Sequence, residues 1–221
     1  MMGLFETASD RVTVDVWSDI MCPFCYMGDA ALGLAIDRFD HPVAVRYHSY
    51  QLMPDLPAGK VSDLAELLEQ RRGFPRDQAS AMNAQITQRA AQVGLTYNMG
   101  QAQTVNTRAA HRLSHLAKER GAQHAMMQRL FSAYFTDGLN VGDYDQLAEL
   151  AAEVGLDREQ ALAALESDAF ASDVDADIAA AQQLGITGVP FFVFDGAIAV
   201  SGAQPVETFS QALNQAWAAR L

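Results

Sequence analysis

Hydrophobic and polar residues alternate near the start of this chain of 221 residues. From Arg11 to Trp17, valines occupy every second position, and a period of two is typical of a β-strand. Val43 to Tyr50 alternates in the same way. Between these stretches we expect a helix from Pro23 to Phe39, because a proline is tolerated in the first turn of a helix. The pattern predicts a β-α-β unit, whose two strands are normally parallel.

The middle of the chain, from Ser62 to Gly185, is rich in alanine, leucine and glutamine and has no strand pattern. Asp143 with Gln146, and Asp157 with Gln160, have the spacing of a capping box at a helix N-terminus. Four glycines follow apolar helical segments, as the residue after a helix end often does: Gly94, Gly121, Gly155 and Gly185. We expect about five to seven helices in this block.

Strand patterns return near the end of the chain. Phe191 to Phe194 is a short apolar run, and Asp195-Gly196 is a strong signal for the turn of a β-hairpin. Ile198 to Val200 is the expected second arm, and Pro205 is expected to open a last helix. The chain therefore ends in a β-β-α unit.

Neither terminal unit is large enough to fold alone, so we expect them to share one sheet. The predicted fold class is α/β, with β-α-β and β-β-α units separated by a large all-helical insertion. In this division, residues 11–60 and 186–221 form one discontinuous domain, and residues 61–185 form the insertion domain. The composition, 50% hydrophobic, provides for a substantial core.

The charge and the N-terminus limit the classes of partner. The formal net charge is −12, and an acidic surface repels nucleic acid and anionic membranes, so we expect neither as a partner. The first residues lack the basic and apolar regions of a secretory signal, and no apolar stretch reaches the roughly 20 residues of a membrane span. We expect a cytoplasmic protein that is a monomer or a homodimer.

Cys22 and Cys25 are the two cysteines of the chain. A structural disulfide framework would need more cysteines, and a structural zinc site usually takes four ligands. A single C-x-x-C in a cytosolic chain is more often redox-active, and we expect no metal. Two alternatives stay open, namely a pair of inert buried thiols and half of a zinc site that histidines complete.

The position of the cysteine pair suits thiol–disulfide exchange. Cys22 is expected between a strand and a helix, where unpaired backbone N–H groups and the helix dipole stabilise a thiolate. Residues three apart lie on the same side of a helix, so Cys25 would be within reach of a disulfide. Cys22 would attack a substrate to form a mixed disulfide, and Cys25 would resolve it.

Histidines and acids provide weaker candidates. His111 and His115 are four apart in a helical segment, a spacing that can ligate a metal, but the glutamate of H-E-x-x-H is missing, so we favour a packing role. His48 lies in a predicted strand, and we expect it to be structural. Asp15 and Asp19 could exchange protons with the second cysteine if buried, although a solvated or capping acid is the favoured interpretation.

Gly188-Val189-Pro190-Phe191 stands immediately before a predicted strand. A proline that enters an edge strand needs an unusual backbone, for which a cis peptide bond is one solution. From the residues alone, an ordinary trans turn is favoured.

Several blocks together resemble a known family. Val14 to Gly28, which contains Cys22-Pro23-Phe24-Cys25, resembles the active-site opening of the FrnE-like branch of the DsbA family, in the thioredoxin superfamily. Those proteins usually have tryptophan where Phe24 stands. Four further blocks look like the same family: Leu52-Met53-Pro54-Asp55, Asn106 to Leu113, Gly188 to Phe194, and Ser201-Gly202-Ala203-Gln204.

The resemblance implies a thioredoxin fold with a helical insertion, a nucleophilic Cys22, a resolving Cys25 and a cis Pro190. It also implies that the backbone at Val189 pairs with the substrate polypeptide near its disulfide. Pro23 and Phe24, between the cysteines, are expected to contact the substrate as well. The implied partners are thiols or disulfides of proteins or small molecules. No cofactor is expected beyond the redox-active disulfide, with glutathione as a candidate electron partner.

Two other functions compete with this interpretation. The related 2-hydroxychromene-2-carboxylate isomerases and kappa-class glutathione transferases share the fold, but they typically have serine where Cys22 stands and lack a resolving thiol. The third class is a holdase or partner-binding protein whose cysteines only sense redox state. The Pro-Phe pair brings no basic side chain to the thiolate, so we expect a less oxidising pair than one with Pro-His.

Overall fold

The structure, a computed structural model, describes residues 10–62 and 76–220. The chain divides into two compact units, one made of residues 1–52 and 170–221 and the other of residues 53–169. We call the first the sheet unit and the second the helical unit. Both boundaries differ from the predicted ones, because residues 170–185 belong to the sheet unit and residues 53–60 to the helical unit.

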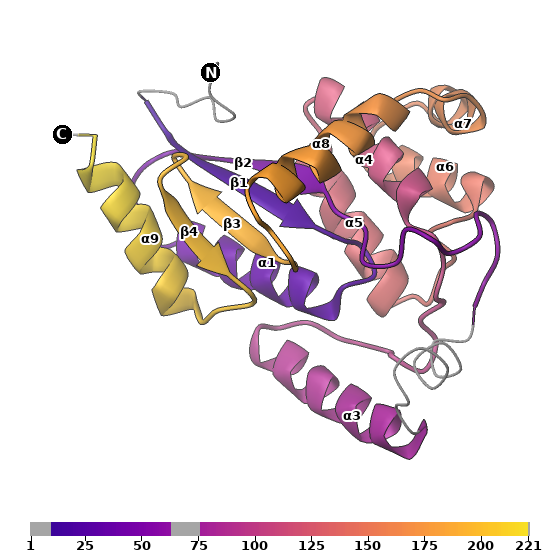
Figure 1. Ribbon diagram of the computed structural model, residues 1–221, viewed down its shortest axis with the longest axis horizontal. Coiled ribbons are helices and arrows are strands. Elements are labelled where there is room, and N and C mark those ends of the chain that lie inside the picture. Colours follow the sequence, from indigo (N-terminus) through magenta and orange to yellow (C-terminus); the bar gives the residue numbers. More distant parts are fainter. Residues whose placement is uncertain (1–9, 63–75, 221) are drawn as a thin grey trace. The chain divides into compact units, whose positions relative to one another are not determined.

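The sheet unit is built on one mixed sheet of four strands (Figure 1). The strands are β1 (Val12–Ser18), β2 (Val43–Ser49), β3 (Phe191–Phe194) and β4 (Ile198–Ser201), in the order β2-β1-β3-β4. β1 pairs parallel with β2 and antiparallel with β3, and β3 and β4 form an antiparallel hairpin. The predicted order of β-α-β and β-β-α units around one sheet is confirmed, and this is the thioredoxin fold.

Three helices cover the sheet, with α1 and α9 on one side and α8 on the other (Figure 1). They are α1 (Pro23–Ile36), α8 (Ala171–Gln183) and α9 (Val206–Ala218). α1 ends three residues before the predicted Phe39. Because both faces of the sheet are covered, all seven residues of β1 are buried, although their alternation alone is typical of a half-exposed strand.

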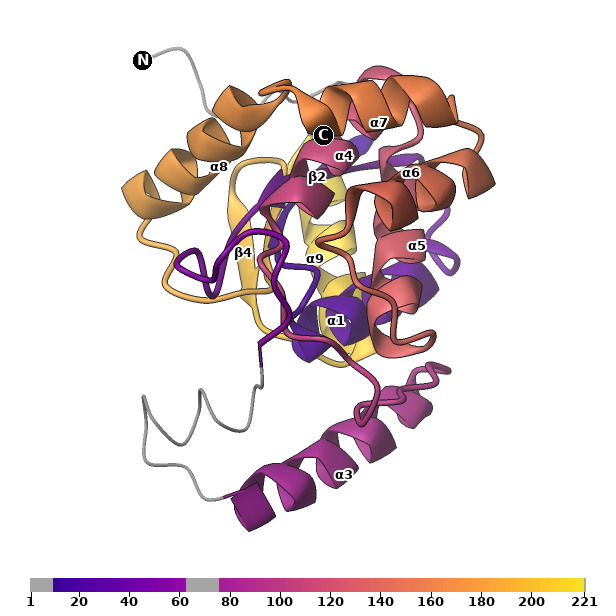
Figure 2. The same cartoon turned by 90° about the vertical axis from the view of Figure 1, so that its right-hand side faces the viewer.

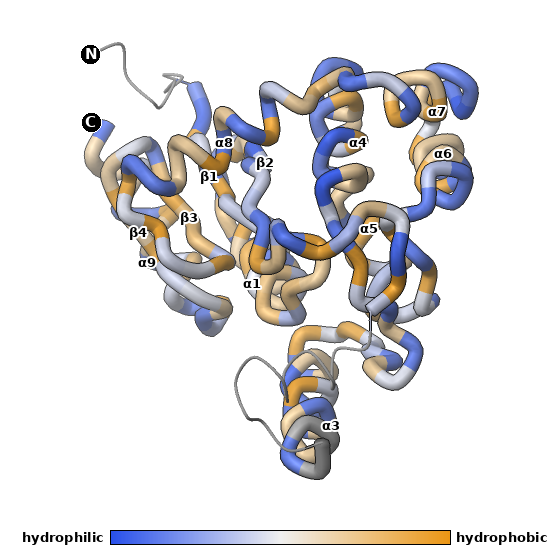
Figure 3. The backbone as a smooth tube through the Cα atoms, turned by 45° about the vertical axis from the view of Figure 1, so that its right-hand side comes forward, coloured by the Kyte–Doolittle hydropathy of each residue, from blue (hydrophilic) through white to orange (hydrophobic). Residues whose placement is uncertain are grey.

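The face of the sheet toward α1 and α9 is mainly apolar. Val14 and Val16 of β1 lie opposite Phe194 and Phe192 of β3, and Figure 3 shows hydrophobic positions along both strands. Phe209 of α9 is fully buried and meets the ring of Phe192 edge to face, with ring centroids 4.8 Å apart. These side chains form the hydrophobic core under α1.

The opposite face explains why α8 belongs to the sheet unit. The indole of Trp17 donates a hydrogen bond to the backbone carbonyl of Asp177 in α8, at 3.2 Å. Trp17 also packs in one hydrophobic cluster with Ala181 and Ile186. The helical pattern of residues 171–183 is the same as in the insertion, so the sequence alone could not separate α8 from it.

The turn between β3 and β4 confirms the predicted hairpin signal. Asp195 and Gly196 both have positive φ, 48° and 66°. Two central residues with positive φ are the signature of the tight turn that Asp-Gly favours. The Asp195 carboxylate also accepts the backbone N–H of Thr13 at 2.8 Å and forms an ion pair with Arg220, so it ties the hairpin to β1 and to the end of α9.

The helical unit contains α3 (Arg76–Gln92), α4 (Arg108–Glu119), α5 (Gln123–Phe135), α6 (Tyr144–Glu153) and α7 (Arg158–Glu166). α4 packs on α5, and α6 packs on α7 (Figure 2). The predicted N-terminal caps are confirmed, because Asp143 accepts the N–H of Gln146 and Asp157 accepts the N–H of Gln160. Among the described residues, no helix combines the length and the apolar character needed to cross a membrane.

Two polar side chains join distant pieces of the helical unit. The amide of Asn106 donates to the backbone carbonyls of Pro54 and Leu56. The buried guanidinium of Arg112 donates to four carbonyls at and beyond the end of α7, where a helix leaves carbonyls without intrahelical partners. These are the carbonyls of Ala164, Leu165, Ser167 and Ala169.

Candidate active site

Cys22 stands at the N-terminus of α1, in the short connection from β1. It is the residue before the first helical position and has an extended backbone, with φ −85° and ψ 112°. Its N–H donates to the carbonyl of Asp19 at 3.0 Å, and its own carbonyl accepts the N–H of Cys25 at 3.0 Å. Pro23 then opens the helix, where its missing N–H leaves no hydrogen bond unmade.

The structure brings Cys22 next to a segment 167 residues away. The thiol of Cys22 donates to the backbone carbonyl of Val189, with Sγ 3.6 Å from the oxygen. The peptide bond between Val189 and Pro190 is cis. The ideal Cβ position of Gly28 would lie 3.1 Å from the Pro190 ring, so the glycine lets α1 approach this segment closely.

Cys25 lies one turn further along α1. Both cysteines are free thiols and buried, with 3% of Cys22 and 1% of Cys25 exposed. Burial raises the pKa of the Cys25 thiol well above its usual value, and the hydrogen bond and charge of Cys22 raise it further. The Ser18 side chain and the N–H of Asp19, whose nitrogen is 3.5 Å from the Cys25 Sγ, act in the opposite direction. These effects together favour the protonated form of Cys25.

Asp19 is not the solvated acid that was one of the favoured interpretations, and the N-cap of α1 is Cys22, without a side-chain cap hydrogen bond. Asp19 is fully buried, and its carboxylate accepts the N–H of Leu52 at 2.8 Å and that of Met21 at 3.5 Å. Asp19 thereby holds the connection that leads into Cys22. The carboxylate of Asp15 points elsewhere, because both of its oxygens are bonded to Arg46 and one of them also to His48.

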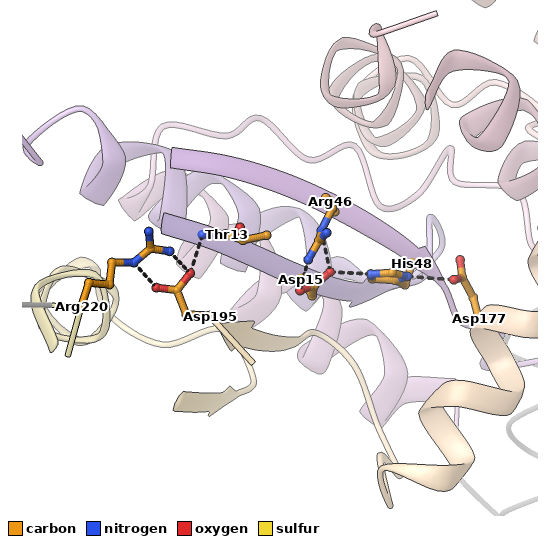
Figure 4. A network of polar contacts seen from close by, with 7 residues as sticks. All are labelled: Thr13, Asp15, Arg46, His48, Asp177, Asp195 and Arg220. Carbon is orange, nitrogen blue, oxygen red and sulfur yellow. Dashed lines mark hydrogen bonds and ion pairs between the residues drawn. The ribbon is translucent and has the colours of Figure 1, made fainter. Parts of the chain in front are cut away.

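A polar network under α8 is the feature that the sequence analysis missed (Figure 4). Arg46 donates to both oxygens of Asp15, at 3.0 and 2.9 Å. His48 lies between two carboxylates, with Nε2 2.8 Å from Asp15 Oδ1 and Nδ1 2.8 Å from Asp177 Oδ1. The Trp17 ring is stacked on the imidazole, with centroids 4.5 Å apart.

Part of this network had a signal in the sequence. In the parallel pairing of the two alternating strands, Asp15 lies opposite Arg46 and Trp17 opposite His48. An alignment of the two predicted strands would have placed these pairs side by side. Asp177 had no such signal, because it lies 129 residues from His48 in a helix that the sequence assigned to the insertion.

The remaining candidates from the sequence are two histidines of α4 and the two residues between the cysteines. His111 and His115 are buried in α4, in keeping with the favoured packing role. Among residues 10–62 and 76–220, no group of three or more His, Cys, Asp and Glu side chains could hold a metal ion. Pro23 and Phe24 are the first two residues of α1, and both are half-buried.

Comparisons with known proteins agree with this geometry. The model of the DSBA-like thioredoxin domain matches residues 13–214. The uncharacterized protein YwbO of Bacillus subtilis is 31% identical over 206 residues, which cover 92% of this chain and 96% of YwbO. The crystal structure of the probable DsbA oxidoreductase SCO1869 from Streptomyces coelicolor is 42% identical, with a TM-score of 0.89 over 95% of this chain and 92% of that one.

A third structure shares the fold at low identity. A 2-hydroxychromene-2-carboxylate isomerase is 16% identical, with a TM-score of 0.72 over 92% of this chain and 95% of that one. This likeness shows the fold alone. The family match extends from β1 through the helical unit into α9, and it includes both cysteines and the cis proline. The chain therefore belongs to the family of DSBA-like thioredoxin domains.

Proposed function

We propose that this protein is a thiol–disulfide oxidoreductase in which Cys22 is the nucleophile and Cys25 the resolving thiol. The observation that carries the proposal is the position of Cys22 at the N-terminus of α1, with Cys25 one turn behind it. The helix N-terminus stabilises a thiolate at Cys22, while the raised pKa of Cys25 keeps a proton on the second sulfur. The raised pKa suits Cys25 to the second, resolving step.

The reducing direction has two steps. The Cys22 thiolate attacks one sulfur of a substrate disulfide, so a Cys22–substrate disulfide forms and the other substrate sulfur leaves as a thiolate. Cys25 then loses its proton and attacks Cys22 Sγ, which forms the Cys22–Cys25 disulfide and releases the second substrate thiol. Two electrons pass from the enzyme dithiol to the substrate. The oxidising direction is the same sequence in reverse.

The backbone at Val189 is the proposed docking strand for the substrate. Its carbonyl already accepts a hydrogen bond from the Cys22 thiol, so a polypeptide that pairs there would bring its own sulfur to the nucleophile. Pro23 and Phe24 would contact the substrate from the helix side. The substrates are disulfides or thiols of proteins or small molecules, glutathione is the proposed electron partner, and no further cofactor takes part.

The direction of the reaction follows from the residues between the cysteines. Neither Pro23 nor Phe24 brings a positive charge to the thiolate, so we propose a pair less oxidising than the strongest DsbA oxidants, whose potential is about −120 mV. In a cytoplasm poised at roughly −220 to −320 mV, a reducing pair stays mainly a dithiol. This would suit reductase or isomerase work by a member of the FrnE-like branch.

The test is a titration of the protein against glutathione redox buffers, with free thiols trapped by a mass-tagging alkylator. Wild type should switch between a dithiol and one intramolecular disulfide, and the midpoint gives the potential. Cys25→Ser should accumulate mixed disulfides through Cys22, because the resolving thiol is gone. Cys22→Ser, the matched control, should accumulate none.

The proposal would be overturned if the Cys22–Cys25 disulfide failed to form at every redox potential of the glutathione buffers. A midpoint near about −120 mV would overturn only the proposed direction. If no disulfide forms, glutathione-dependent isomerisation is the alternative function to test.

A further inference from the structure

His48 occupies a position that requires an extra proton. A neutral imidazole has one N–H donor and one bare nitrogen. Both ring nitrogens of His48 lie 2.8 Å from carboxylate oxygens, one of Asp15 and one of Asp177 (Figure 4). An ionised carboxylate only accepts hydrogen bonds, so the two contacts together require a protonated His48 that donates from both nitrogens. Arg46 and His48 then balance the two carboxylates.

This bridge fastens α8 to the sheet. The second oxygen of Asp177 accepts the N–H of Ser49, at the end of β2, at 2.7 Å. The backbone carbonyl of Asp177 accepts the indole N–H of Trp17 from β1. Asp177 is thus held by β1 and β2, and protonated His48 is the charged part of that attachment.

The same helix leads to the segment opposite the nucleophile. α8 ends at Gln183, and the N–H of Ile186 bonds back to the carbonyl of Ala181 at 2.9 Å, so the exit from the helix is fixed. Val189 is partly buried against the cluster that contains Trp17, Ala181 and Ile186. Trp17 therefore belongs to both arrangements: His48 stacks on its ring, and Val189 packs against the cluster that contains it.

We propose that protonated His48 is a positioning residue: by bridging Asp15 and Asp177 it holds α8, and through α8 it sets the Val189 backbone for pairing with a substrate polypeptide at Cys22. The proposal rests on the proposed function and adds a condition to it. Loss of the proton would place a bare nitrogen against one carboxylate, and the attachment of α8 would weaken.

The pH range of this effect follows from the groups around the imidazole. Burial lowers the pKa of His48, but its hydrogen bonds to Asp15 and Asp177 and their charges outweigh burial, so the pKa is raised above the ordinary value of about 6.5. Arg46 is the other charged group at the bridge, and it neutralises part of the Asp15 charge. The bridge is therefore complete below about pH 6.5 and is lost as the pH rises through the raised pKa.

Two probes with the same leaving group isolate the positioning effect. One is dithiodipyridine, and the other is an unstructured peptide whose cysteine carries a thiopyridyl group. In both reactions the Cys22 thiolate attacks a disulfide and thiopyridone leaves, so the ratio of the two rates cancels the titration of Cys22. Reduced protein is mixed with a substoichiometric amount of each probe from about pH 6 to about pH 10, which spans the expected titration. Release of thiopyridone is followed by absorbance.

In wild type, the ratio of peptide to small-probe rates should fall about tenfold as the pH rises, the order expected for a small misplacement of a reacting group. Asp177→Asn should make the ratio independent of pH, because the asparagine amide can donate to a neutral imidazole while its oxygen still accepts the Ser49 N–H. Asp173→Asn removes the same charge from an exposed position of α8 and should behave like wild type.

A wild-type ratio that stays constant across a pH range in which NMR shows His48 to titrate would overturn the proposal. So would an Asp177→Asn variant whose ratio falls as in wild type. Circular dichroism checks that each variant is folded. The dependence of the wild-type rate ratio on pH tests the proposal even if a variant does not fold. If Cys22→Ser releases thiopyridone as fast as wild type, the proposed function itself is wrong, which is a separate result.

Discussion

The two faces of the sheet in the sheet unit are held by different forces. Under α1 and α9, valines of β1 and phenylalanines of β3 and α9 pack without charges between them. Under α8, the same strand contributes Asp15 to a network with Arg46, His48 and Asp177. An apolar contact keeps its strength over a wide pH range, whereas a bridge that needs a proton does not. On one face β1 therefore packs in a core that does not depend on pH. On the other face it takes part in a contact with α8 whose strength depends on the protonation of His48.

The largest effect is expected on the apolar face. Phe209→Ala should lower the free energy of unfolding by about 3–5 kcal/mol, because a fully buried ring is removed from its contacts with Phe192 and Phe194. Urea unfolding gives this value directly. Phe209→Leu is the matched control, and it should cost clearly less because most of the volume remains. A loss for Phe209→Ala as small as for an exposed substitution would mean that this face is not the main core.

A smaller effect is expected where the apolar side contains a polar pair. Tyr47 of β2 donates from its hydroxyl to Asp29 of α1 at 2.5 Å, and both residues are buried. Burial raises the pKa of Tyr47 well above its usual value, and the charge of Asp29 raises it further. Tyr47→Phe should therefore destabilise the protein by about 1–3 kcal/mol, since a buried carboxylate loses a donor.

The measurement for Tyr47→Phe is again urea unfolding, with Tyr50→Phe as the control on a half-buried tyrosine three residues later. If both variants lose the same stability, the Tyr47–Asp29 bond contributes nothing specific. A loss confined to Tyr47→Phe would show that even the apolar side depends on one hydrogen bond.

The smallest effect at neutral pH is expected under α8, and its dependence on pH is what distinguishes this face. The raised pKa of His48 contributes stability that is complete below about pH 6.5 and is lost as the pH rises through the pKa in the folded state. Asp177→Asn should be less stable than wild type by about 1 kcal/mol at pH 6, because a charge-assisted hydrogen bond becomes a neutral one. That difference should shrink as the pH rises.

Unfolding free energies measured at several pH values test this expectation. Asp173→Asn, exposed on the same helix, should follow the wild-type curve within about 0.5 kcal/mol. If the unfolding free energies of wild type and Asp177→Asn changed with pH in parallel, a protonated bridge would be contradicted. The stability of the two faces of the sheet would then not differ in its dependence on pH.

The sequence predicted most of the fold because its signals are local. Alternation placed β1 and β2, Asp195-Gly196 placed the hairpin, and the two aspartate caps placed the starts of α6 and α7. The division into units was predicted less well. The contacts that assign α8 to the sheet unit come from Trp17 and His48, which are far from α8 in the sequence.

The candidate site also has parts that local sequence signals predicted and parts that they did not. The cysteine pair and its place at a helix N-terminus could be predicted from a strand, a C-x-x-C and a proline. The neighbouring carbonyl of Val189 needed the family resemblance, since no local pattern joins positions 167 residues apart. The role of Asp177 needed the structure, because an aspartate on an alanine-rich helix has no feature that distinguishes it from its exposed neighbours.

Arg112 of α4 has a consequence for how related chains are recognised and classified. Its guanidinium holds carbonyls at the end of α7, and a lysine could not replace it, because a single ammonium lacks the planar fork. With Asn106, it lies in one of the blocks that first indicated the family. That block is a marker of how the insertion is built, whereas the C-x-x-C block marks the chemistry. A chain that has the second block without the first should be grouped by its sheet unit alone, and its inserted module compared separately.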